Sequence, residues 1–182
     1  MTGVEKTITY FSEPGSENTN EVIKAVIRRV EERGIKTVVV ASTSGDTGVK
    51  FAKALKGKAN TVVVPEPEKM KPELRSEIVK LWGIVVDATN LPLHGRGMDR
   101  VRNAFYALGQ GFKVSIEVIL MATDKGAIKP YEAVVGVGGS GKDSDTAIIA
   151  RSTTTKETFS GEPSKKLEVT EIIAMPLQKK WW

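Results

Sequence analysis

Seven consecutive small or hydroxyl-bearing residues form the stretch of this sequence best suited to chemistry. They are Ser42, Thr43, Ser44, Gly45, Asp46, Thr47 and Gly48. They follow a β-branched run, Thr37 to Val40, and precede a segment with helical spacing. Such a turn presents unpaired N–H groups at a helix N-terminus, where about half a positive charge accumulates, and its glycines let an anion approach. Because the hydroxyls outnumber the needs of one helix cap, we predict a phosphate-binding turn, with an ordinary cap as the alternative.

A second candidate is the glycine-rich segment GVGGSGKD at Gly136 to Asp143. It nearly matches a P-loop, which needs Ser or Thr directly after the lysine and then a helix. Here Asp143 takes that position, and a strand-like run follows. We therefore predict a hairpin that offers N–H groups and Lys142 to an anion. A hairpin without a binding role remains the alternative.

A third group could supply acid, base or charge. Its members are Glu117, Asp124, His94, Arg96 and Arg100. Glu117 lies inside the apolar run Val114 to Met121, and a buried carboxylate there would need a partner. A half-exposed Glu on an amphipathic helix is the alternative. With one histidine, no cysteine and no ligand spacing, the sequence does not support a metal site.

Composition limits the class of protein. At 182 residues, with 40% hydrophobic and 27% charged side chains, the sequence is typical of a single domain spanning residues 1–182. It has no apolar run of roughly 20 residues and no signal-peptide pattern, so we expect a cytoplasmic protein. The abundant Lys, Glu and Arg favour a heat-adapted source. The net charge of +5 suits an anionic ligand, but it is spread along the chain and does not indicate nucleic-acid binding.

The elements expected around these segments alternate between strand and helix. Strands are predicted at residues 7–11, 37–40, 61–64, 84–87, 133–137, 146–151 and 169–175, and helices from a cap at Asn18 or Thr19 to Gly34 and at residues 47–55, 72–81, 99–108 and 112–125. The last helix also alternates like a strand, but its length favours a helix. The close spacing of 133–137 and 146–151 implies an antiparallel pair. We therefore predict a three-layer αβα sandwich with a mixed, mostly parallel sheet.

The chain ends in Lys179-Lys180-Trp181-Trp182. Buried aromatic residues dominate interface energetics, so these tryptophans favour docking on a partner subunit and hence a homo-oligomer. A frayed terminus is the alternative.

The turn from Ala41 to Gly48 resembles the phosphate loop of fold-type II pyridoxal-phosphate enzymes, above all threonine synthase. Those enzymes need a Schiff-base lysine well upstream and a second large domain. None of Lys6, Lys24 or Lys36 has the expected context. We retain the phosphate from this resemblance and reject the enzyme.

Three segments together resemble the stand-alone archaeal and bacterial proteins similar to the C-terminal domain of pyruvate kinase. They are YFSEPGSENTNEVI at Tyr10 to Ile23, TVVVASTSGDTGVKFA at Thr37 to Ala52, and EVILMATDKGAI through AVVGVGG at Glu117 to Gly139. In pyruvate kinase the matching turn holds a sugar-phosphate effector under a glycine-rich loop. The resemblance implies that Ser42 to Gly48 hold phosphate, that Gly138, Gly139, Ser140 and Lys142 belong to a lid, and that Pro14, Gly15, Glu117 and Met121 complete the site.

The family resemblance also implies the ligand. Members of the stand-alone family resemble flavin mononucleotide (FMN) binders, whereas Asp46 disfavours a doubly phosphorylated sugar. We therefore expect the chain to bind FMN, and none of the phosphoenolpyruvate or metal machinery of the kinase barrel is in the sequence. Three roles remain open at this point: a flavin-dependent redox protein, a non-catalytic sensor of a phosphorylated metabolite, and an assembly module.

Overall fold

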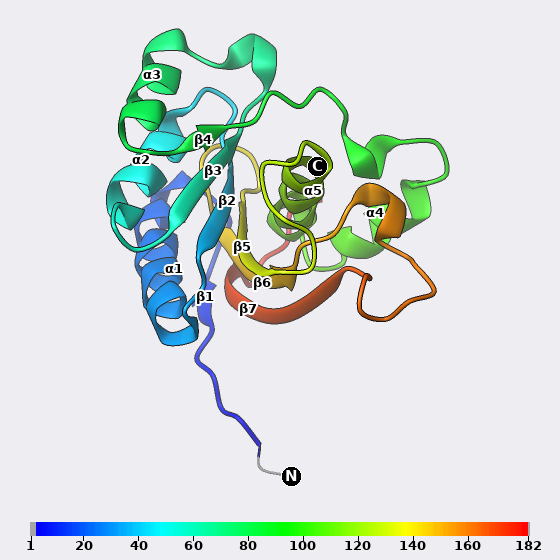
Figure 1. The fold of residues 1–182 in the computed structure, drawn as a ribbon. Coiled ribbons are helices and arrows are strands. Elements are labelled where there is room, and N and C mark those ends of the chain that lie inside the picture. Colours follow the sequence, from blue (N-terminus) through cyan, green and yellow to red (C-terminus); the bar gives the residue numbers. More distant parts are fainter. Residues whose placement is uncertain (1–2, 182) are drawn as a thin grey trace.

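A computed structural model describes residues 3–181 and contains one seven-stranded mixed sheet with helices on both faces (Figure 1). The strands are β1 (Thr9–Phe11), β2 (Thr37–Ala41), β3 (Asn60–Val64), β4 (Ile84–Val85), β5 (Ala133–Gly138), β6 (Thr146–Arg151) and β7 (Glu168–Pro176). The α-helices are α1 (Thr19–Arg33), α2 (Asp46–Leu55), α3 (Pro72–Lys80), α4 (Asp99–Tyr106) and α5 (Gln110–Asp124). Short 3-10 helices occur at Ser16–Asn18, Pro67–Lys69, Pro92–His94 and Thr155–Glu157.

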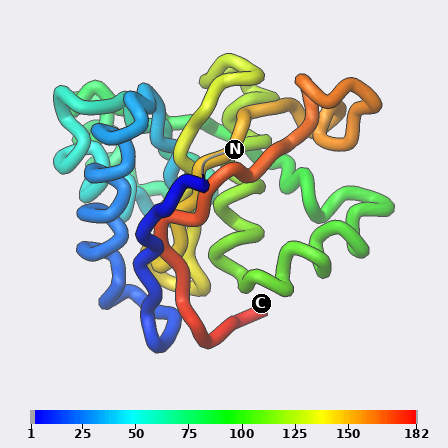
Figure 2. The backbone as a smooth tube through the Cα atoms, turned by 90° about the horizontal axis from the view of Figure 1, so that it is seen from below, coloured from blue at the N-terminus to red at the C-terminus, as the bar shows by residue number. Residues whose placement is uncertain are grey.

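The sheet order is β1-β7-β6-β5-β2-β3-β4. The strands β5, β2, β3 and β4 run parallel, whereas β6 is antiparallel to both β5 and β7. This confirms the predicted mixed sheet and the antiparallel pair. The first strand β1 pairs in parallel with the last strand β7, so these two strands, far apart in the sequence, lie side by side (Figure 2).

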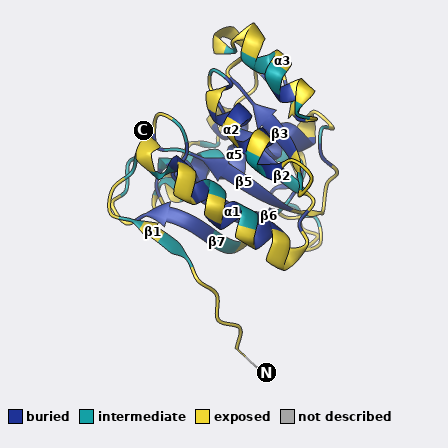
Figure 3. Cartoon of the chain, turned by 90° about the vertical axis from the view of Figure 1, so that its left-hand side faces the viewer, coloured by how far each residue is buried: buried dark blue, intermediate teal, exposed yellow. Residues whose placement is uncertain are grey.

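Apolar residues on β2 explain why the sheet is covered on both sides. Val38 and Val40 pack with α1 and α2, while Val39 packs with α5 on the opposite face. Successive strand side chains point to opposite faces, so a continuous valine run fits a strand buried on both sides. Figure 3 shows the dark, buried strands between helices whose outer faces are exposed.

Residues 112–125, whose sequence fits both a strand and a helix, belong to helix α5. Most of its residues are buried, including Ile116, Ile119 and Leu120, which form one core with strand residues on that face of the sheet. A long buried helix was the prediction for residues 112–125, and it is confirmed. Two strand predictions were wrong in length, because β1 begins at Thr9 and β4 ends at Val85.

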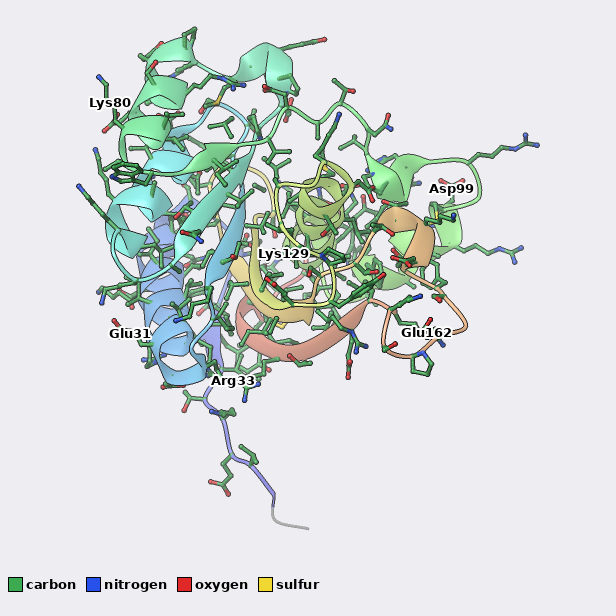
Figure 4. All side chains as sticks on the ribbon, in the orientation of Figure 1. Glu31, Arg33, Lys80, Asp99, Lys129 and Glu162 are labelled. Carbon is green, nitrogen blue, oxygen red and sulfur yellow. The ribbon has the colours of Figure 1, made fainter. Side chains whose placement is uncertain are left out.

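Many charged side chains lie at the periphery of the molecule. Figure 4 shows Lys80 at the end of α3, Asp99 at the start of α4 and Glu162 in the loop before β7 at the outer surface. All three residues are exposed. Among residues 3–181, every helix is too short or too polar to cross a bilayer.

Candidate functional site

An open cleft of about 670 Å³ lies beyond the carboxyl ends of the parallel strands β2, β3 and β5. Its floor includes Ala41 and Val64, the last residues of β2 and β3, and one wall is the first half of α5. From β2 the chain proceeds to β3 and β4 on one side, and β5 then returns to the other side of β2. Open α/β sheets bind ligands at such a reversal of strand order.

The hydroxyl-rich turn connects β2 to α2 at the edge of the cleft. Ser42 is buried, and its Oγ accepts the Gly48 N–H at 3.0 Å, so this hydroxyl caps α2. Within the described residues, the N–H groups of Gly45, Asp46 and Thr47 donate to no protein acceptor. A helix N-terminus with free amides is a binding site for anions.

The remaining hydroxyls of the turn donate to carboxylates. The pairs are Thr43 with Glu66 at 3.2 Å, Ser44 with Asp46, and Thr47 with Asp143 at 2.9 Å. All six side chains line the cleft. The hydroxyls are therefore held at the site by acceptors that an incoming oxyanion would replace.

Lysines accompany each of these carboxylates. The ion pairs are Lys69 with Glu66 at 2.6 Å, Lys71 with Asp46 at 3.8 Å, and Lys50 with Asp143 at 3.3 Å. The Ser44 hydroxyl, followed by nearby Lys71, lowers the pKa of the exposed Asp46 below its ordinary value of 3.8. Asp46 therefore remains charged at neutral pH, and the lysine beside each of the three carboxylates offsets its charge.

The glycine-rich hairpin between β5 and β6 covers another side of the cleft. Gly139, Gly141 and Lys142 line it, and Lys142 is exposed without an ion pair to any described residue. Gly138 and Ser140 do not line it. Gly138 instead lies beneath α5, where an added Cβ would be 2.3 Å from the Gly111 carbonyl oxygen.

Asp145 connects this hairpin to the loop that carries Pro14 and Gly15. Its carboxylate is 1% exposed and accepts the Ser140 N–H at 3.1 Å and the Thr146 hydroxyl at 2.8 Å. Burial raises the pKa of Asp145, while hydrogen bonds from Thr146, Ser140 and the Gly15 amide oppose that increase. The Gly15 amide thus contacts Asp145, and neither Pro14 nor Gly15 lines the cleft.

The first half of α5 contributes a buried ion pair to the cleft wall. Lys113 and Glu117 are 3% and 4% exposed, and the Lys113 ammonium donates to Glu117 Oε2. Glu117 Oε1 accepts the Leu93 N–H at 3.1 Å. The Lys113 Nζ also lies 2.8 Å from His94 Nε2. The alternative of a half-exposed Glu117 is therefore wrong, and the partner that the buried carboxylate needs is Lys113.

His94 is held at the cleft because its neighbour Leu93 is fully buried in the core. Partial desolvation and the charge of Lys113 lower the pKa of His94 below 6.5, with Glu117 opposing. An ammonium can only donate, so Nε2 is the acceptor toward Lys113, while Nδ1 lies 3.5 Å from the Arg102 guanidinium. His94 is thus neutral at pH 7 although it retains solvent exposure.

Several other residues singled out in the sequence lie away from the cleft. Asp124 accepts hydrogen bonds from the Thr155 amide at 2.9 Å and from its hydroxyl, so it caps a 3-10 helix. Met121 belongs to the core, and Arg96 and Arg100 are exposed outside the cleft. Gly45 and Gly48 shape the turn without lining the cleft.

Some cleft residues were missed in the sequence. They are Glu66, Gln110, Lys113, Val114, Val118 and Asp143. Lys113 stands four residues before Glu117, and this spacing places two side chains together on a helix. The predicted helix at residues 112–125 was therefore enough to predict the contact between Lys113 and Glu117. The approach of Glu66 and Asp143 to the hydroxyl turn depends on the tertiary structure alone.

The site therefore combines free helix amides, hydroxyls, a free lysine and an apolar wall. Among residues 3–181, no three side chains of the His, Cys, Asp or Glu type are placed together to hold a metal ion. No known protein-family model matches the chain. The functional assignment consequently rests on the chemistry of the cleft.

Proposed function

We propose that this protein binds a phosphorylated ligand in the cleft, with FMN as the preferred ligand. The observation that carries the proposal is the pair of free amides of Asp46 and Thr47, two cleft-lining residues at the N-terminus of a ten-residue helix. Lys142 adds a cation on the hairpin side. Free amides, the helix dipole and a lysine are the groups that stabilise a phosphate dianion.

The apolar wall supports a ligand with a ring system. Ala41, Val64, Pro65, Leu91, Val114 and Val118 line the cleft together with the polar groups. The volume of about 670 Å³ lies within the range of about 300–1,000 Å³ typical of cofactor sites. A planar ring beside a phosphate anchor would occupy both parts of the cleft.

The family resemblance is consistent with this proposal. The strand–turn–helix at Thr37 to Ala52 and the glycine-rich hairpin, which carry the resemblance to the C-terminal domain of pyruvate kinase, border the same cleft. A flavin-dependent redox role follows from this proposal if the bound FMN is reducible.

The three carboxylates that accept the hydroxyls of the turn, Asp46, Glu66 and Asp143, are the main opposition to phosphate binding. Each carboxylate forms an ion pair with a lysine, so the field at the turn is weaker than three bare charges would produce. A monophosphate then needs to replace only the carboxylates as acceptors of the hydroxyl hydrogens.

Purified protein provides the direct test. We expect a flavin absorption spectrum from protein prepared without added cofactor, or saturable quenching of FMN fluorescence on titration, with the released compound identified by mass. Thr47→Val should weaken FMN binding by roughly tenfold or more, because a hydrogen bond to a charged group contributes about 1.5–3 kcal/mol. The matched control is Thr61→Val, a buried threonine of β3 outside the cleft.

Equal FMN affinity in the two threonine variants would place the phosphate elsewhere. Gly45→Val is a poor choice for this test. Gly45 has a left-handed φ of 103°, and an added Cβ would lie 2.9 Å from Leu74 Cβ. That change would strain the fold, so lost binding would not identify the site.

A second candidate is a non-catalytic sensor of a sugar monophosphate. The hydroxyls and carboxylates at the turn favour it, since carboxylates accept hydrogen bonds from sugar hydroxyls. This candidate predicts stabilisation of about 2.7 kcal/mol at a ligand concentration 100 times the Kd. Thermal unfolding with ribose 5-phosphate and with FMN, in parallel, separates the two candidates.

A further inference from the structure

Lys113 is a buried lysine at the cleft that belongs to neither the hydroxyl turn nor the hairpin. It lies on α5, and its side chain is 4% exposed, yet it lines the cleft. Burying a lysine loses side-chain entropy and hydration, so a lysine in such a place needs fixed partners. Glu117 Oε2 and His94 Nε2 are those partners.

Lys113, Glu117 and His94 form a cluster whose hydrogen bonds leave one N–H of the lysine available. An ammonium has three N–H groups. Glu117 and His94 accept two of them, and among the described residues no other acceptor contacts the Lys113 Nζ. Glu117 is fixed in turn, because its second oxygen accepts the Leu93 N–H. The ammonium is therefore held in place with one N–H available to the cleft.

The charge of the cluster determines which acceptor suits it. Glu117 neutralises Lys113, and His94 is neutral because its pKa is lowered. The cluster as a whole thus attracts a phosphate dianion much less than the α2 N-terminus and Lys142 do. A neutral acceptor, such as a carbonyl oxygen or ring nitrogen, matches a single directed N–H.

We propose that Lys113 is a second recognition point, which donates a hydrogen bond to a carbonyl oxygen or ring nitrogen in the non-phosphate part of the ligand. Glu117 and His94 are positioning residues that hold its ammonium. This proposal rests on the proposed function, since it assumes a ligand anchored by its phosphate at α2. It adds that the cleft selects ligands by a polar ring edge and not by phosphate alone.

The test compares two probes on each variant. FMN carries both the phosphate and a ring with carbonyl groups, whereas inorganic phosphate, measured as a competitor of FMN, carries only the anchor. Lys113→Met should weaken FMN binding by roughly tenfold or more, because it removes one directed hydrogen bond and leaves a buried acid. It should change the phosphate inhibition constant by less than about twofold. Thr47→Val should weaken both probes.

Additional variants show whether a loss of binding comes from the cleft or from unfolding. Lys24→Met removes an exposed helical lysine that pairs with Glu21 at 2.7 Å, far in sequence from the cleft, and should leave both probes unchanged. If Lys113→Met does not fold, the double variant Lys113→Met with Glu117→Gln removes both buried charges and serves in its place. Glu117→Gln alone should weaken FMN binding less than Lys113→Met, because the ammonium remains.

The outcomes separate the two proposals. If the wild type binds FMN, phosphate competes and Lys113→Met retains wild-type FMN affinity, the role of Lys113 is wrong and the proposed function stands. Equal losses of affinity for FMN and phosphate in Lys113→Met would also overturn the proposed role of Lys113. They would show that Lys113 binds the phosphate itself or supports the fold of the whole site. If the wild type binds no FMN, or phosphate does not compete, the proposed function fails and the role of Lys113 fails with it.

Discussion

Asp145 is a buried carboxylate that joins three segments around the cleft. It accepts hydrogen bonds from the Ser140 amide and the Thr146 hydroxyl, and it also faces the Gly15 amide. An added Cβ on Gly111, in the first turn of α5, would lie 2.6 Å from its Oδ1. This one side chain thus contacts the hairpin, the loop that carries Gly15 and the start of β6, and it lies beside the first turn of α5.

The raised pKa of Asp145 predicts a pH dependence of stability. Because its folded pKa lies above 3.8, the folded state binds the proton more tightly than the unfolded state does. The stabilising contribution of the neutral acid is complete below pH 3.8 and is lost as pH rises through the folded pKa. We expect Asp145→Asn to remove this slope in the free energy of unfolding, measured by urea titration across that range. An unchanged slope in the variant would contradict the assignment.

The buried ion pair and its contact with His94 illustrate which contacts the local sequence can predict. Glu117 within an apolar run indicated that a partner would be needed if the acid were buried, and the four-residue spacing to Lys113 is a local signal that was missed. His94, 19 residues before Lys113, had no local signal for the contact. It reaches Lys113 because Leu93 fills the core beside α5.

Two glycines of β5 determine how closely α5 approaches the sheet. An added Cβ on Gly136 would lie 2.5 Å from the Ser115 carbonyl oxygen, and one on Gly138 would lie 2.3 Å from the Gly111 carbonyl oxygen. Both contacts involve backbone, which cannot rotate away as a side chain can. The glycines of β5 therefore serve the packing of the helix that carries Lys113 and Glu117, whereas Gly139 and Gly141 border the cleft.

Gly138→Ala tests this packing at the level of the element. Since α5 must shift to admit the methyl group, we expect a loss of about 1–3 kcal/mol in the free energy of unfolding. Gly161→Ala is the control, because no heavy atom lies within 4 Å of its added Cβ. Chemical denaturation of both variants gives the comparison, and equal stabilities would show that α5 adapts without cost.

At the scale of the whole molecule, the C-terminal segment returns to the start of α5. The Lys180 carbonyl oxygen accepts the Gln110 N–H at 2.6 Å, and an added Cβ on Gly141 would lie 3.4 Å from the Lys180 Nζ. Trp181 is 53% exposed, and Trp182 lies outside the described residues. The segment thus caps α5 and borders the hairpin, while the proposed docking of the tryptophans on a partner subunit remains a prediction.

Truncation after Gln178 addresses both roles of this segment. Loss of the Lys180 contact should lower the free energy of unfolding by about 1 kcal/mol, the net value of one hydrogen bond. If the tail also mediates assembly, sedimentation should show a homo-oligomer for the full chain and a monomer for the truncated one. The same mass for both chains would remove the assembly role and leave the cap intact.

The sequence by itself determined the local elements of this protein. Valine runs specified the buried strands, Gly34 ended α1, and the small polar residues after β2 specified a turn at a helix start, because these signals act between near neighbours in the chain. Only the tertiary structure decided that the turn, the hairpin and α5 border one cleft. It also decided that Glu66 and Asp143 accept the hydroxyls of the turn and that His94 meets Lys113. Those contacts depend on the strand order, in which β5 returns beside β2, and long-range pairing of this kind leaves no periodic trace in the sequence.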